Sequence, residues 1–273
     1  MKELSKLRVA AVQFRASRDK SENLEKVLSY IDEASKNAEL IVFPECVMCY
    51  PLPREGFTEI AEPLDGEFIK SLLNSAKEHD VNIVFNTWET CREAADKVYD
   101  TSIFISSNGE IKSIYRKTHL FDAFKFRESY FIKPGDEFAG PVALRGFNVG
   151  MLICYDVRFP ETARILTVKG CNVICVSAAW YSGLLKEEHW LTMIRARAIE
   201  NGVYIIAANQ SGPTFCGRSV IIDPFGVILA DAGDMEKVIH SELELERLKN
   251  VREILPLINQ RRPNLYRDLT IQF

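Results

Sequence analysis

Three residues whose side chains could together carry out acyl transfer each follow a predicted strand. Glu45 follows the apolar run 40–43, Lys117 follows the strand 111–115, and Cys154 follows the strand 147–153. In parallel α/β sheets, functional side chains gather at the carboxyl ends of strands. A thiol, a carboxylate and an ammonium group are the nucleophile, the proton carrier and the oxyanion stabiliser that acyl transfer needs. The placement therefore predicts a site for this chemistry.

Each of the three residues taken alone has a simpler explanation. Cys154 at a strand-to-helix turn would be near backbone N–H groups and a helix end that favour the thiolate, but a lone cysteine is more often a buried core residue. Glu45 could be the first solvated residue of a loop, and Lys117 could belong to a basic surface turn. Their shared placement at strand ends is what favours the catalytic interpretation.

The elements that must position these residues alternate between strands and helices in the first half of the chain. Asp19 is predicted to begin the first helix, with Glu22 as its capping partner, and Asn108-Gly109 is a hairpin turn. The predicted elements are a strand at 7–14, a helix with an apolar face from 24 to 31, a strand at 40–43, a helix over 68–76, a strand at 81–88 and a hairpin of 102–106 with 111–115.

The second half repeats this order. Its predicted elements are a strand at 147–153, a helix from Pro160 to just before Gly170, a strand at 172–177, a helix that ends at Asn201-Gly202, a strand at 203–208 and a hairpin of 219–222 with 227–230. Near-continuous apolar strands joined by helices indicate parallel sheets covered on both faces. We therefore expect an α/β fold in which two pseudo-symmetric β-α-β-α-β-β halves stack as a four-layer α-β-β-α sandwich. This domain would span residues 1–248, and 249–273 would be a tail packed on the domain or on a partner subunit, which favours a homodimer or higher homo-oligomer.

Composition excludes several classes of protein and partner. The 273 residues include 34 Lys+Arg and 38 Asp+Glu, with 47% hydrophobic residues, so the chain is neither disordered nor fibrous. With a net charge of -4, the chain lacks the excess of basic residues that is typical of a nucleic-acid-binding protein. Neither a signal peptide nor an apolar run of ~18 residues is present, so we expect no membrane contact. Seven cysteines without a secretion signal favour reduced thiols in the cytoplasm.

The motifs around these residues resemble the nitrilase superfamily of carbon–nitrogen hydrolases over almost the whole chain. Each motif is weakly specific alone, but their order and spacing are highly specific. They are Ile-Val-Phe-Pro-Glu at 41–45, Tyr-Arg-Lys-Thr-His-Leu-Phe at 115–121, Cys-Tyr-Asp-Val-Arg-Phe-Pro-Glu at 154–161, His-Trp at 189–190, Arg-Ala-Arg-Ala-Ile-Glu-Asn at 195–201 and Arg-Pro-Asn-Leu-Tyr at 262–266. The α-β-β-α sandwich of that family agrees with the fold expected from periodicity.

The resemblance implies a Glu-Lys-Cys catalytic triad of Glu45, Lys117 and Cys154. It also implies a second assisting glutamate, for which Glu128 is the first candidate, with Glu137 and Glu161 as alternatives that also lie near motifs. In the implied reaction, Cys154 attacks an amide carbonyl, ammonia leaves, and water releases a carboxylic acid from the thioester. No metal and no organic cofactor takes part. Glu161 is expected to pair with Arg158 or Arg164 on the following helix.

The residues after Cys154 favour the amidase side of the family, including omega-amidases. True nitrilases usually carry Trp-Glu there, and carbamoylases a different polar run, so N-carbamoyl amino acid amidohydrolase or nitrilase activity is the alternative. The expected substrate-binding residues are Tyr50, Tyr155, Arg158, Trp180 and Tyr181, with Phe124 as a further aromatic candidate. If Arg158 or Lys125 faces the pocket, the monoamide of a dicarboxylic acid becomes the favoured small-molecule substrate.

Two interpretations from other classes compete with the enzyme. Cys46 and Cys49 form a C-x-x-C, but zinc needs about four ligands and no second pair accompanies them. Pro51 and Pro53 oppose the helix that a thioredoxin-type motif requires. A catalytically silent binding scaffold is the second alternative. The presence of all three residue types of the triad argues against it.

Overall fold

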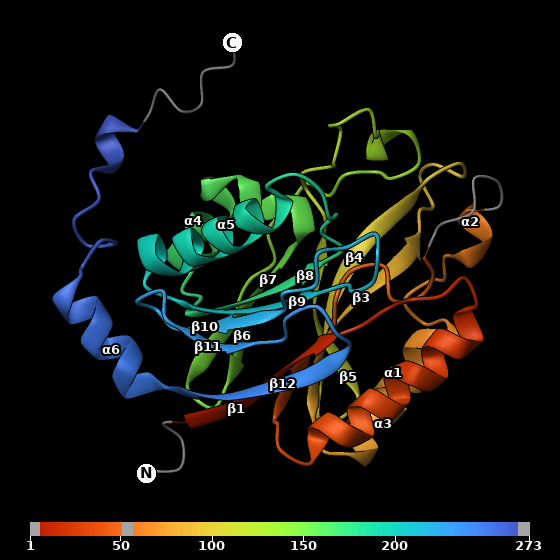
Figure 1. Cartoon of the computed structure of the whole chain (residues 1–273), viewed down its shortest axis with the longest axis horizontal. Coiled ribbons are helices and arrows are strands. Elements are labelled where there is room, and N and C mark those ends of the chain that lie inside the picture. The colour runs from red at the N-terminus through yellow and green to blue at the C-terminus, as the bar shows by residue number, and fades with distance from the viewer. Residues whose placement is uncertain (1–5, 51–56, 267–273) are drawn as a thin grey trace.

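Two sheets lie face to face in the computed structural model, which describes residues 6–50 and 57–266 (Figure 1). Helices α1 (Lys20–Ser35) and α3 (Glu67–Glu78) cover the outer side of one sheet. Helices α4 (Pro160–Val168) and α5 (Lys186–Asn201) cover the outer side of the other. The predicted four-layer α-β-β-α sandwich is confirmed.

The first sheet has the strand order β12-β1-β2-β3-β4-β5. Strands β1, β2 and β3 are parallel, while β4, β5 and β12 pair antiparallel with their neighbours. Their bounds are β1 (Lys6–Gln13), β2 (Leu40–Val42), β3 (Asn82–Thr90), β4 (Val98–Ser106), β5 (Glu110–Arg116) and β12 (Lys237–Glu244).

The second sheet repeats this arrangement in the order β11-β10-β9-β8-β7-β6. Strands β7, β8 and β9 are parallel, and the outer strands are antiparallel to their neighbours. Their bounds are β6 (Val142–Leu144), β7 (Phe147–Ile153), β8 (Val173–Ala178), β9 (Tyr204–Asn209), β10 (Val220–Ile222) and β11 (Ile228–Asp231).

Strands β6 and β12 occupy equivalent places in the two halves, each antiparallel to the first parallel strand. The sequence analysis missed both. β6 has only three residues, and β12 is an edge strand that carries charged residues which interrupt its apolar pattern. β12 comes from the second half of the chain but completes the first sheet, so the two halves are not independent units.

Alternation along β1 shows why its sequence is almost continuously apolar. Leu7, Val9 and Ala11 pack in the core between the sheets, whereas Ala10 and Val12 pack in the core beneath α1 and α3. A strand buried on both faces has no polar side to present.

Helix termini follow the expected chemistry with one difference. Asp19 caps α1 by accepting hydrogen bonds from the N–H groups of Ser21 and Glu22. The Glu22 side chain accepts from the Ser17 hydroxyl, so the predicted reciprocal capping contact from Glu22 is wrong. Gly202 ends α5 with a φ of 57°, in the left-handed region that glycine adopts readily.

The remaining elements are short or lie near the C-terminal end. They are α2 (Phe57–Ile60), η2 (Glu128–Tyr130), η3 (Cys154–Arg158), α6 (Leu245–Ile254) and η4 (Pro263–Leu265). The predicted boundary after residue 248 lies inside α6, which buries Leu248 and Val251. Figure 1 shows the chain after α6 running past the edge of the helical layer. Packing of this tail on a partner subunit stays a prediction.

Within the described ranges, no helix is long and apolar enough to cross a membrane.

Candidate active site

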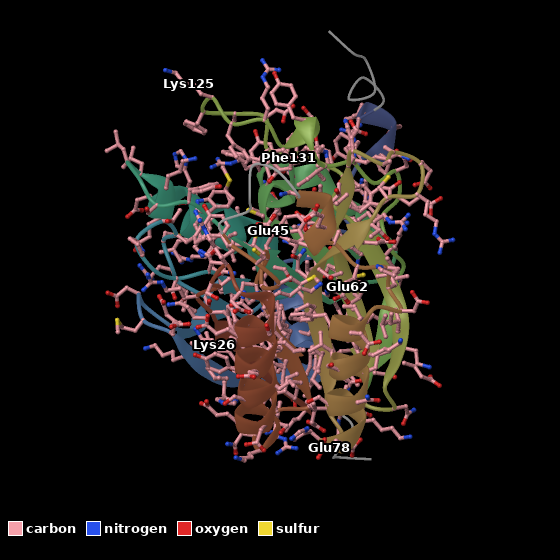
Figure 2. All side chains as sticks on the ribbon, turned by 90° about the vertical axis from the view of Figure 1, so that its right-hand side faces the viewer. Lys26, Glu45, Glu62, Glu78, Lys125 and Phe131 are labelled. Atoms are coloured by element: carbon pink, nitrogen blue, oxygen red, sulfur yellow. The ribbon has the colours of Figure 1, made fainter. Side chains whose placement is uncertain are left out.

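The four predicted catalytic residues meet at the carboxyl ends of the parallel strands. Figure 2 shows Glu45 between Phe131 and Glu78, the last residue of α3. Glu45 follows β2, Lys117 follows β5, and Cys154 follows β7. Glu128 begins η2, which folds back over this edge.

Lys117 is at the centre of the charged groups. Its Nζ lies 2.7 Å from Glu45 Oε1 and 3.0 Å from Glu128 Oε1, and its side chain is completely buried. Burial lowers the pKa of Lys117, but the charges of Glu128, Glu45 and Asp100 outweigh this effect and hold the pKa well above its ordinary value. The group is therefore a permanent cation near neutral pH.

Glu45 is held by both sheets. Its Oε2 accepts a hydrogen bond from the Ala179 N–H at 2.7 Å, directly after β8. Gln210 Nε2 donates to the Glu45 carbonyl oxygen at 2.8 Å. Because both contacts come from the second sheet, the stacking of the two halves fixes the orientation of this carboxylate.

Cys154 stands at a backbone position that an L-residue seldom adopts. Its φ is 41°, in the left-handed region, at the turn from β7 into η3. Strain of this kind persists where the surrounding structure enforces it, commonly at active sites. The turn places the partly exposed thiol in the same pocket as Glu45 and Glu128.

The electrostatics of Cys154 differ from the expectation. A helix end was expected to favour the thiolate, but burial and the negative charge of Glu45 raise the pKa of the thiol well above its ordinary value, against the opposing effect of Lys117. The expectation is wrong because α4 begins only at Pro160, whereas the thiol lies beside a carboxylate. A thiol in this state needs a base to become a nucleophile.

The pocket above these groups holds the predicted substrate-binding residues. All five of them line it: Tyr50, Tyr155, Arg158, Trp180 and Tyr181. Its empty space, including the open mouth, is about 570 Å³. Phe124 lies farther out, in an adjoining apolar groove with Leu184. Lys125 is exposed at the periphery and does not line the pocket (Figure 2), so it is not the pocket cation.

Arg158 is the pocket cation instead. Its guanidinium lies 4.3 Å from the centre of the Trp180 ring, and burial lowers its pKa. Neither Arg158 nor Arg164 forms the predicted ion pair with Glu161, since Arg164 donates to the Glu200 carbonyl and Arg158 makes no ion pair among the described residues. Lys186, which the sequence analysis missed, also lines the pocket and lies 3.7 Å from the centre of the Phe124 ring.

Residues 8–253 match the family model described as carbon-nitrogen hydrolase. The chain belongs to the carbon–nitrogen hydrolase family. It is 37% identical to the 2-oxoglutaramate amidase of Bacillus subtilis, with 94% of this chain and 98% of the relative covered. It is 34% identical to the omega-amidase NIT2 of Xenopus tropicalis, with 96% and 98% covered. Among solved structures, Nit3 of Saccharomyces cerevisiae, a member of the nitrilase superfamily, is similar with a TM-score of 0.85 at 30% identity, with 94% and 97% covered.

Two acids of this carbon–nitrogen hydrolase were missed by sequence reasoning. Asp156 accepts hydrogen bonds from the Ile153 N–H at 3.0 Å, the Tyr115 hydroxyl at 2.7 Å and the His119 N–H at 3.1 Å. It thereby joins the Cys154 turn to the segment that carries Lys117. Asp100 is fully buried with Oδ2 3.3 Å from Lys117 Nζ. A signal was available for Asp156, which stands two residues after Cys154, whereas Asp100 lies beside Thr101 and Ser102 and carries no comparable signal.

The other cysteines of the hydrolase have surroundings that differ from those of Cys154. Cys46 lines the pocket, whereas Cys49 Sγ contacts the Arg18 carbonyl. Over the described ranges, no group of three His, Cys, Asp or Glu residues is arranged to hold a metal ion. Burial raises the pKa of Cys171 to about 11, so this core thiol is a poor nucleophile.

Proposed function

We propose that this hydrolase cleaves the terminal amide of a small dicarboxylic acid monoamide through a thioester on Cys154, as an omega-amidase-like enzyme. One observation carries the proposal: the Cys154 thiol shares a pocket with a buried Glu45–Lys117–Glu128 cluster. The names of the amidase relatives, which cover nearly the whole chain, support the same reaction. Glu45 and Lys117 are in direct contact and Cys154 lines the same pocket as Glu45, which speaks against a silent scaffold.

The first half of the reaction forms the thioester. Glu45 removes the thiol proton as Cys154 Sγ attacks the amide carbonyl, because the raised pKa of the thiol keeps it protonated at rest. The Lys117 ammonium and the Tyr155 N–H stabilise the oxyanion. Glu45 then passes its proton to the leaving nitrogen, the C–N bond breaks, and ammonia departs.

The second half releases the acid. Glu45 takes a proton from water as the water attacks the thioester carbonyl, and the C–S bond breaks. The thiol recovers its proton from Glu45, so no proton is lost over the cycle. Glu128 positions the amide nitrogen and then the water, since its carboxylate is fixed by Lys117 and by the Phe121 N–H at 2.7 Å.

The substrate carboxylate is assigned to Arg158. This guanidinium forms no ion pair among the described residues and lies in the same pocket as Cys154. A partly buried cation is stabilised by an anion, and arginine binds carboxylates in a bidentate manner. The ammonium of Lys186 adds a second positive charge on this wall. The rings of Tyr50, Trp180 and Tyr181 would enclose the short carbon chain.

The cytoplasm is the proposed location of the enzyme. All seven cysteines lie within the described residues, and they form no disulfide. A reducing compartment maintains cysteines in this state.

Ammonia release from four compounds tests the substrate assignment. They are 2-oxoglutaramate, propionamide, an N-carbamoyl amino acid and propionitrile. We expect 2-oxoglutaramate to be hydrolysed most efficiently. Arg158→Met should raise its KM by about 10- to 100-fold, the loss of one charged hydrogen-bonded contact, and affect propionamide far less.

The matched control is Arg195→Met, which removes an arginine that binds the Gly226 carbonyl outside the pocket. An equal loss on 2-oxoglutaramate and propionamide in Arg158→Met would contradict the carboxylate assignment. Preference for the carbamoyl compound, which also carries a carboxylate, would identify the alternative N-carbamoyl amino acid amidohydrolase.

A further inference from the structure

Asp100 is a buried acid beneath the site, and none of the catalytic steps above uses it. It lies on β4 and is completely inaccessible to solvent. Its Oδ1 accepts a hydrogen bond from Asn86 Nδ2 at 2.6 Å, and the Cys46 N–H in turn donates to Asn86 Oδ1. Its Oδ2 lies 3.3 Å from Lys117 Nζ and accepts no hydrogen bond from a donor among the described residues.

The charges around Lys117 do not balance if every acid is ionised. Glu45, Asp100 and Glu128 all lie within 3.3 Å of the one ammonium, which gives three negative charges against one positive charge. No other cation forms an ion pair with these three carboxyl groups within the described part of the chain. Burial of excess charge is so costly that a group of this kind retains a proton instead.

Hydrogen-bond donors distinguish which acid retains the proton. Both oxygens of Glu45 accept hydrogen bonds, from Lys117 and from the Ala179 N–H. Both oxygens of Glu128 also accept, from Lys117 and from the Phe121 N–H. Asp100 has one accepting oxygen, so its carboxylate is the least stabilised of the three. We infer that Asp100 is protonated in the resting enzyme and acts as a positioning residue that leaves Glu45 as the ionised base.

The groups that face Asp100 from each neighbouring element agree with this assignment. They are Glu45 and Cys46 after β2, Asn86 on β3, Lys117 after β5 and Glu128 on η2. Burial and then the charge of Glu45 raise the pKa of Asp100 well above its ordinary value, while Lys117 and Asn86 oppose the rise. The nearest positive charge, the Lys117 ammonium, already donates hydrogen bonds to the carboxylates of Glu45 and Glu128.

A neutral Asp100 matters to catalysis through Lys117. With Asp100 protonated, the ammonium is shared by Glu45 and Glu128 alone, and the rest of its field is available to the oxyanion. Ionisation of Asp100 would place another negative charge beside Lys117 and Glu45, which weakens oxyanion stabilisation. Activity should therefore fall on the alkaline side as Asp100 loses its proton. This catalytic consequence rests on the proposed function, whereas the protonation state does not.

Carbon-13 NMR of protein labelled at the Asp side-chain carboxyl carbon measures the protonation state directly. We expect one resonance of the wild type to have the chemical shift of a protonated acid at neutral pH and to be absent from Asp100→Asn. Asp32→Asn, on the exposed side of α1, is the matched control and should retain that resonance. Titration of every Asp resonance of the wild type near pH 4, the ordinary value, would overturn the inference even if no variant folds.

The dependence of kcat/KM on pH provides the second measurement. We expect the wild type to lose activity at the alkaline pH where the NMR resonance titrates, and Asp100→Asn to lack that loss. The pKa of Lys117 is raised above its ordinary value of about 10.4, so deprotonation of Lys117 does not account for an activity loss below that pH. A resonance that stays protonated over the whole range, without an alkaline loss, also supports the inference.

An alkaline loss that follows the NMR titration but is unchanged in Asp100→Asn would overturn the catalytic role of Asp100. Absence of amide hydrolysis in every protein would instead reject the proposed function and leave the NMR result standing.

Discussion

The chemistry of single residues here depends on a buried cation that serves several acids. Lys117 was predicted as the oxyanion stabiliser, and the structure surrounds it with Glu45, Glu128 and Asp100. The types and strand-end positions of Glu45, Lys117 and Cys154 made their meeting predictable from sequence. Asp100 was not predictable in the same way, because its role depends on how many donors reach each carboxyl group, and only the packed structure shows this.

Replacement of Lys117 by Met tests the importance of this cation for stability. The variant leaves the two buried carboxylates of Glu45 and Glu128 without their counter-charge, so we expect the unfolding free energy to fall by about 3–5 kcal/mol at neutral pH. The folded pKa of Lys117 is raised, so its stabilising contribution is complete below its ordinary pKa of about 10.4 and is lost only as pH rises through the raised value.

The loss of unfolding free energy in Lys117→Met should depend on pH, because the acids around Lys117 can take up protons. The pKa of Glu128 is raised by burial, so this carboxylate takes up a proton readily as pH falls, while Asp100 is already protonated. The difference between Lys117→Met and the wild type should therefore shrink toward about pH 5. Denaturant unfolding at several pH values measures it, with the exposed Lys112→Met as the control. A loss no larger than that of the control would contradict the importance of the buried cation.

At the scale of elements, the turn from β7 into η3 is positioned by a network rather than by a helix end. Asp156 accepts hydrogen bonds from Ile153 before the nucleophile and from Tyr115 and His119 on either side of Lys117. Hydrophobic periodicity predicted the strand and the helix that flank this turn. It could not predict the left-handed backbone of Cys154, because that conformation is enforced by contacts between distant segments.

Substitution of Asp156 by Ala should separate the nucleophile from the charged groups. We expect a loss of kcat of roughly 10²-fold, because misplacement of a reacting group by about 1 Å is enough to produce this effect. Unfolding free energy should also fall by about 1–3 kcal/mol or more, since several buried donors lose their acceptor. Steady-state kinetics and thermal unfolding measure the two effects. Asp122→Asn, which affects an exposed contact with Ser129, is the control. Unchanged kcat in Asp156→Ala would show that the turn holds its geometry without this acid.

At the scale of the whole molecule, the site exists because two similar halves stack. Glu45 from the first half is oriented by Ala179 and Gln210 from the second. The repeat of strands and helices predicted the sandwich from sequence. It did not predict that β12 crosses from the second half to complete the first sheet, because edge strands with charged residues have a weak apolar pattern.

The C-terminal segment tests the predicted homo-oligomer. Ile254, Leu265 and Tyr266 are exposed apolar side chains on or after α6, with Ile254 76% exposed. If these side chains form one patch, they would provide a contact surface for a second copy of the chain. We expect the whole chain to have a mass in solution that is a multiple of 31.1 kDa, and deletion of residues 256–273 to lower it. Light scattering coupled to size-exclusion chromatography measures both, and circular dichroism confirms that the shortened chain is folded. An unchanged mass after the deletion would contradict the role of the tail.

The central claim is that Cys154 is the nucleophile of an amide hydrolase. Ammonia release from 2-oxoglutaramate by wild type, Cys154→Ala and Cys216→Ala tests it most directly, since Cys216 lies outside the pocket beside Asn209. We predict that Cys154→Ala lowers kcat by roughly 10⁴-fold or more, while Cys216→Ala remains active. Substantial activity of purified, folded Cys154→Ala would contradict the thioester mechanism and with it the role assigned to Glu45 and Lys117.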